Sequence, residues 1–112
     1  MHKSAQLKAT REMAGYSQQA LADALGVHVR TVSRWERGAL PVPEDALLLV
    51  EEALKRQVVD VDATLDAIEQ GCPAVLPYSR ADGLGNATAR QVAHHLLMLG
   101  EDFEFEYQDE HV

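Results

Sequence analysis

The sequence of 112 residues predicts a mainly α fold with a small α+β part at its C-terminal end. Two observations carry this prediction. Apolar residues recur at helical spacing in the first 70 positions, first in short segments and then in one long stripe. Beyond Gly71, two strand-like segments (74–79 and 103–107) flank one further helical segment. We expect an N-terminal helical bundle, a long linking helix and a C-terminal strand–helix–strand region that dimerises.

Three short helices are predicted before residue 39. The first runs from Ser4 to Ala14, and Gly15 ends it. Ser17 is a good N-cap for the second, and Gly26 can adopt the left-handed conformation that ends it before the chain enters a third helix. The third helix carries arginines on its open side. Two short helices that share a core, with guanidinium groups on the free face, are typical of a helix-turn-helix reader of DNA.

The segment SQQALADALGVHVRTVSRWERG (17–38) resembles the Xre/Cro, lambda-repressor-like helix-turn-helix family. The resemblance covers about residues 4–56 and is carried by Gln18, the Leu21-Ala22 pair, Gly26-Val27 at the turn, and the run from Val32 to Gly38. It implies that Arg30 and Arg34 read base edges and that Gln18 and Arg37 bind phosphates. It also implies a buried ion pair between Arg11 and Glu36.

Two positions depart from the family pattern. His28 stands where the family usually has Ser or Thr as the cap of the third helix, so a weaker cap is expected. Val29 replaces a polar residue; it cannot hydrogen-bond to a base, but it can pack on a thymine methyl group. The predicted DNA-binding residues are Gln18, His28, Val29, Arg30, Thr31, Ser33, Arg34 and Arg37.

The segment 43–70 is predicted to form one long helix. Its apolar residues follow an average spacing of about 3.5, as in a coiled coil: Leu47, Val50, Leu54, Val58, Val61, Leu65 and Ile68. A separate helix capped by Asp60 or Asp62 is the alternative. A stripe this long needs a partner surface, so the expected dimer interface consists of Leu54, Val58, Val61, Leu65, Phe103, Phe105 and Tyr107.

The last third of the chain is predicted to pair two strands around a helix. Pro77 restricts the first strand to an edge or irregular pairing. Asn86 is expected to cap the helix, whose inner face would be Val92, Ala93, Leu96 and Leu99. The segment 103–107 alternates aromatic and acidic residues and predicts a half-buried strand. The expected division is a DNA-binding domain at 1–56 and a dimerisation region at 57–112, bridged by the helix 43–70.

The second half is also similar to a smaller group, the anti-CRISPR-associated repressors of phages and their small bacterial relatives. This similarity lies in VPED (42–45), AIEQG (67–71) and LPY (76–78). It implies that the rear half dimerises the protein and that the protein represses its own operon.

The net charge of −8 is unusual for a DNA binder, but its distribution is uneven. The balance is +3 in residues 1–42, −2 in 43–58 and −9 in 59–112. A basic head and an acidic rear would orient the protein toward DNA. The modest positive count predicts weak non-specific affinity for each subunit, so dimerisation would be needed for useful binding.

Other classes of site find little support in the sequence. No apolar run approaches 18 residues, so we expect a cytoplasmic protein with no membrane partner. Cys72 is the only cysteine, and the adjacent His94 and His95 point to different sides of a helix, so no metal site is expected. No nucleophile lies beside a base in any known pattern. We therefore expect no catalytic residues, no enzyme activity and no cofactor.

These observations predict a homodimeric, sequence-specific transcriptional repressor that inserts its third helix into the major groove of a palindromic operator. Two alternatives stay open: an antitoxin whose acidic rear binds a toxin-like partner, and a protein-interaction adaptor that binds no nucleic acid. RNA also stays open as a partner, because the charge pattern does not separate duplex DNA from structured RNA.

Overall fold

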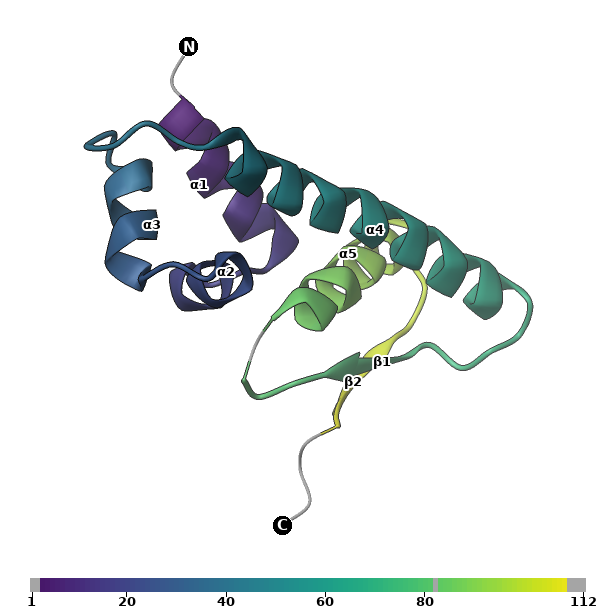
Figure 1. Ribbon diagram of the computed structural model, residues 1–112. Coiled ribbons are helices and arrows are strands. Elements are labelled where there is room, and N and C mark those ends of the chain that lie inside the picture. The colour runs from purple at the N-terminus through teal and green to yellow at the C-terminus, as the bar shows by residue number, and fades with distance from the viewer. Residues whose placement is uncertain (1–2, 82, 109–112) are drawn as a thin grey trace. The chain divides into compact units, whose positions relative to one another are not determined.

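The computed structural model describes residues 3–81 and 83–108 and is mostly helical (Figure 1). Its elements follow one another in the order α1 (Lys3–Ala14), α2 (Gln18–Leu25), α3 (Val29–Glu36), α4 (Glu44–Glu69), β1 (Val75–Tyr78), α5 (Leu84–Met98) and β2 (Glu104–Tyr107). The predicted fold class, mainly α with a small α+β part at the C-terminal end, is confirmed.

The chain divides into two units, residues 1–55 and 56–112. Each unit has a hydrophobic core of its own. The N-terminal core consists of Leu7, Ala14, Leu21, Ala22, Val32, Trp35, Ala46, Leu47 and Val50. The C-terminal core consists of Val61, Leu76, Ala89, Val92, Ala93 and Leu96.

Local capping explains why the first unit contains short helices. The Ser17 hydroxyl accepts a hydrogen bond from the backbone N–H of Ala20 at 3.0 Å and so starts α2. Gly26 ends α2 with φ of 70°, a left-handed conformation that glycine adopts without steric cost. The helix α3 begins at Val29 with His28 as its N-cap. The turn between the two helices is therefore made by Gly26, which ends α2, and by the cap of α3.

The long helix α4 is continuous, as predicted, and the alternative of a separate helix starting near Asp60 is wrong. Glu44 and Asp45 occupy its first turn, where carboxylates favour the positive end of the helix dipole. Its apolar stripe is shared between the two cores rather than forming one seam. Val50 packs in the first core and Val61 in the second, whereas Val58 between them is 61% exposed.

In the second unit, β1 and β2 form a parallel two-stranded sheet in which Leu76 pairs with Phe105. The helix α5 packs its buried side, including Val92 and Leu96, into the core with Leu76. The prediction that Leu99 belongs to this inner face is wrong, because Leu99 follows the last helical turn and is 73% exposed.

Asn86 has a different role from the predicted one. The cap position of α5 is Gly83, and Asn86 lies buried in the first turn of the helix. Its Oδ1 accepts from the backbone N–H of Ser79, and its Nδ2 donates to the carbonyl of Ser79, both at 2.7 Å. Asn86 therefore fixes the loop after β1 to the start of α5.

The strand β2 is more exposed than its alternating pattern predicted, since Phe105 and Tyr107 keep 46% and 43% of their surface exposed. Each ring meets Tyr78 edge to face, with centroids 5.1 and 6.4 Å apart. The guanidinium of Arg80 lies 3.9 Å from the centroid of the Tyr107 ring. The prediction of a half-buried strand is wrong because α5 packs mainly on β1, which leaves both faces of β2 largely in water.

Candidate nucleic-acid interface

The helix α3 has a buried side and an open side. Val32 and Trp35 are almost fully buried in the N-terminal core, so packing holds this side of α3 in place. Arg30 and Arg34 are both exposed and are four residues apart, so they lie one above the other on the open side. We call this pair the arginine face of α3.

The remaining predicted DNA-binding residues surround the arginine face. Thr31 and Ser33 are half-buried, and Arg37 is exposed at the C-cap of α3. Val29 is also half-buried and packs against the first core, so only part of its side chain faces outward. The structure therefore places these predicted residues on or beside one short helix.

His28 caps α3 with its ring. The imidazole Nδ1 accepts a hydrogen bond from the backbone N–H of Arg30 at 3.0 Å. This bond needs a neutral ring whose proton is on Nε2, since a protonated imidazole has only donors. The sequence predicted a weaker cap at this position, and the structure shows that the imidazole supplies the acceptor that Ser or Thr would supply.

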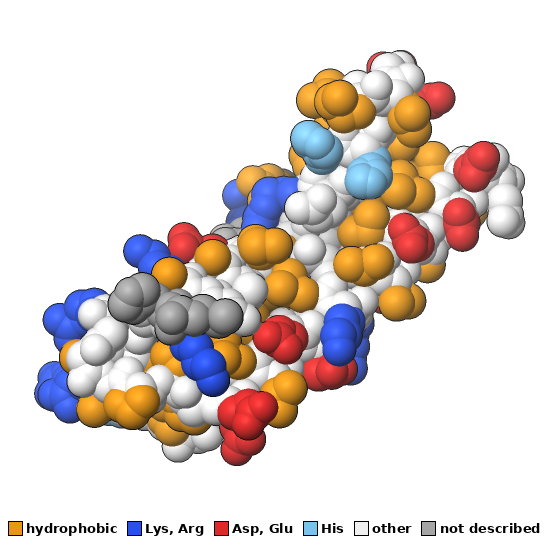
Figure 2. Space-filling view, turned by 90° about the horizontal axis from the view of Figure 1, so that it is seen from above, with side chains coloured by type: hydrophobic (Ala, Val, Ile, Leu, Met, Phe, Trp, Pro, Cys, Tyr) orange, Lys and Arg blue, Asp and Glu red, His pale blue; other side chains and the backbone are white. Residues whose placement is uncertain are grey.

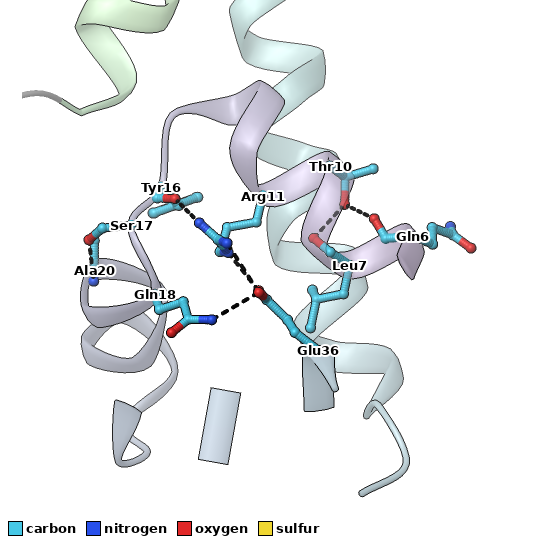
Figure 3. Close-up of polar contacts among 9 residues, drawn as sticks. All are labelled: Gln6, Leu7, Thr10, Arg11, Tyr16, Ser17, Gln18, Ala20 and Glu36. Carbon is cyan, nitrogen blue, oxygen red and sulfur yellow. Dashed lines mark hydrogen bonds and ion pairs between the residues drawn. The ribbon is translucent and has the colours of Figure 1, made fainter. Parts of the chain in front are cut away.

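Behind α3, Arg11 and Glu36 form a two-pronged ion pair (Figure 3). The Nε and Nη2 atoms of Arg11 donate to the two carboxylate oxygens of Glu36 at 2.6 and 3.1 Å. Their side chains are only 10% and 3% exposed. The third donor, Nη1 of Arg11, reaches the carbonyl of Tyr16 at 2.8 Å, so one guanidinium connects α1, the loop before α2 and the end of α3.

Gln18 joins the same network. Its Nε2 donates to Oε1 of Glu36 at 3.0 Å, as Figure 3 shows. This contact was not predicted from the sequence, because Gln18 and Glu36 are 18 positions apart and belong to different helices. An amide group has two N–H donors, so the predicted phosphate contact of Gln18 has to use the second one.

The predicted dimer residues are divided between core and surface. Val61 is buried in the second core, and Leu65 and Phe103 pack against it. Leu54 packs against the first core. Val58, Phe105 and Tyr107 are exposed. Val61 already has its partners within the chain, so the exposed members and the accessible parts of the half-buried ones are left for contact with a second molecule.

Comparison with known families agrees with this geometry. Residues 7–61, which include all of α2 and α3, match the helix-turn-helix family model. The matching model is that of the Xre/lambda-repressor-like helix-turn-helix family, and the match is consistent with an Xre/Cro-like regulator. That family consists of DNA-binding regulators and is typically non-enzymatic, and the match supports a DNA-binding helix-turn-helix regulator.

No curated protein sequence matches the chain. Within residues 3–81 and 83–108, no helix is both long enough and apolar enough to span a membrane.

Proposed function

We propose that this helix-turn-helix protein is a homodimeric, sequence-specific transcriptional repressor of duplex DNA. The single observation that carries the proposal is the arginine face of α3. Arg30 and Arg34 are exposed on a helix whose opposite side is fixed by Trp35 and by the buried Arg11–Glu36 pair. A rigid helix with two outward guanidinium groups suits the major groove, where arginine binds the O6 and N7 atoms of guanine with two hydrogen bonds.

The residues around the arginine face would position the helix. Thr31 and Arg37 are suited to phosphate oxygens, with the second N–H of Gln18 as a further donor. Ser33 can donate to a base or a phosphate, and the outer part of Val29 can touch a thymine methyl group. His28, which caps the helix, lies where the chain would meet the DNA backbone.

Dimerisation follows from the charge balance. Residues 1–42 carry only +3, so one subunit neutralises few phosphates, and its affinity would be low at physiological salt. Two subunits on one duplex combine their contacts in a single complex. A dimer bound over a promoter would block polymerase, and the similarity of the second half to self-regulating phage repressors favours control of its own operon. Such a protein would act in the cytoplasm, where its DNA is.

Selection from random duplex DNA at a stated salt concentration tests this proposal. The full chain should enrich one motif made of two inverted half-sites. Enrichment of no DNA motif would contradict the proposal. A parallel selection from random structured RNA would then separate an RNA-binding protein, which enriches a motif, from an adaptor, which enriches none. Arg56→Ala is a matched control, because Arg56 is an exposed arginine of α4 outside the proposed interface, and its removal should leave the enriched motif unchanged.

A further inference from the structure

The end of α5 exposes a cluster of large apolar side chains. Leu97, Met98 and Leu99 are consecutive and keep 66%, 74% and 73% of their surface in water. Consecutive residues at a helix end point in different directions around its axis, so the cluster projects on several sides. Figure 2 shows hydrophobic side chains gathered beside histidine side chains on this face. A cluster of exposed large apolar side chains of this kind is typical of an interaction site.

An apolar groove lies beside this cluster, within the second unit. It has a volume of ≈ 690 Å³. Leu65 and Ile68 of α4 form one wall, and Met98 and Leu99 form the other. The same surface therefore presents both a projecting apolar cluster and a hollow of matching chemistry.

We propose that this surface, the C-terminal end of α5 with the adjoining groove, is where a second copy of the chain docks about a two-fold axis. In a two-fold interface the same surface of each molecule meets its counterpart, so whatever projects from one copy must find a hollow on that surface of the other. Met98 of one copy enters the groove of its partner while Leu97 packs beside the groove, and the partner does the same in return. The inference deepens the proposed function, because it names the surface that makes the regulator a dimer.

The hydrogen-bonding groups around the groove suit a second copy. His94 and His95 line it together with Glu69 and Glu101, so both potential donors and carboxylate acceptors belong to one surface. A two-fold axis brings the histidines of one copy toward the carboxylates of the other. An imidazole N–H can donate to a carboxylate, so the donors and acceptors of this surface are complementary to those of a second copy.

The strand β2 is a poorer surface for a second copy. Glu104 and Glu106 alternate along it with Phe105 and Tyr107. If two copies of β2 paired about a two-fold axis centred on Phe105, Glu104 of one copy would face Glu106 of the other, and like charges directly opposite destabilise a sheet. The interface inferred here therefore replaces Phe105 and Tyr107, which the sequence pattern favoured, with the end of α5.

A small molecule fits the surface less well than a second copy does. Leu97 is not part of the groove lining, so a ligand held inside the groove leaves this side chain in water. A copy of the chain covers the projecting residues and fills the groove at the same time.

Sedimentation equilibrium of the full chain without DNA, at micromolar concentration, tests the inference. The wild type should sediment at twice the 12.3 kDa chain mass. Leu97→Lys and Met98→Lys, made separately, should each raise the dimer dissociation constant by about tenfold or more, because each places a charge at the centre of an apolar interface. Both positions are exposed, and lysine is favourable near a helix C-terminus, so the monomer should fold. Far-UV circular dichroism checks this, and two separate variants keep the test decisive if one fails to fold.

Val59→Lys is the matched control, since Val59 is a similarly exposed apolar residue of α4 (65%) and should not affect the dimer. A monomeric wild type, or unchanged association of both α5 variants, would overturn the inference. So would a dimer that Phe105→Lys dissociates while the α5 variants do not. Because no DNA is present, these outcomes are independent of whether the chain binds an operator.

Discussion

At the scale of single residues, one carboxylate controls how α3 is held. Glu36 accepts from Arg11 twice and from Gln18 once, and its side chain is only 3% exposed. The hydrogen bonds satisfy a charge that would otherwise be costly to bury. The arginine face is thus supported by a polar network inside the first unit. We expect substitutions in this network to lower stability and substitutions on the arginine face to weaken DNA binding.

Replacing Glu36 by Gln should destabilise the first unit. The change leaves the buried guanidinium of Arg11 without a counter-charge, and breaking one side of a buried pair costs about 3–5 kcal/mol. A thermal or denaturant melt of Glu36→Gln measures this cost. Glu12→Gln, an exposed residue of α1, is the control. A melting temperature equal to that of the wild type would mean that the pair does not hold the helices together.

Replacing Arg34 by Ala should weaken recognition of the DNA bases. It should leave the fold intact, because Arg34 is exposed. Loss of a guanidinium bound to a base should weaken specific binding by about 1–3 kcal/mol and relax the preference at one base position. Titration of the selected duplex and of a random duplex gives both values. An equal loss on the two duplexes would identify Arg34 as a phosphate contact instead.

Replacing His28 by Ala should destabilise α3 by about 1 kcal/mol, because the backbone N–H of Arg30 loses its acceptor. His28→Ser should restore most of this stability, since a hydroxyl can accept the same bond. Denaturant melts of the two variants provide the comparison. If Ala and Ser prove equally stable at this position, the imidazole does not act as a cap.

At the scale of elements, the sequence predicted helices better than their surroundings. The boundaries of α2 and the continuity of α4 follow from local signals, namely caps, glycines and apolar spacing. The start of α5 and the exposure of β2 do not. Asn86 has the residue type of an N-cap, but its side-chain amide forms hydrogen bonds with the backbone of Ser79. No local sequence pattern predicts this contact with the preceding loop. The Gln18–Glu36 bond was missed for the same reason.

Replacing Asn86 by Ala should loosen the connection between β1 and α5. Both backbone groups of Ser79 lose a buried partner, and such losses cost about 1–3 kcal/mol. The melt of the full chain should therefore shift, and amide hydrogen exchange should accelerate around Ser79. Gln91→Ala on the exposed side of α5 is the control. Unchanged amide exchange at Ser79 would contradict the role of Asn86 in fixing the loop after β1 to the start of α5.

At the scale of the whole molecule, the uneven charge makes binding depend on the number of subunits. The acidic residues after position 58 oppose DNA, and the first 42 residues offer a balance of only +3. We therefore expect a single subunit to bind weakly and a two-fold dimer to combine the contacts of two subunits on one duplex. Such a dimer places its two recognition helices about 34 Å apart, so half-sites should lie about 10–10.5 base pairs apart or at a multiple of that distance.

The most direct test of the central claim is the affinity of the full chain for a set of spaced duplexes. The selected duplex is compared with one that carries about five extra base pairs between its half-sites, which is half a helical turn and puts the half-sites on opposite sides of the DNA. A control duplex carries the same insertion outside the site. We predict that the internal insertion reduces affinity to that of a single half-site and that the external insertion has no effect. Equal affinity for all three duplexes would contradict a dimer that reads DNA with two α3 helices.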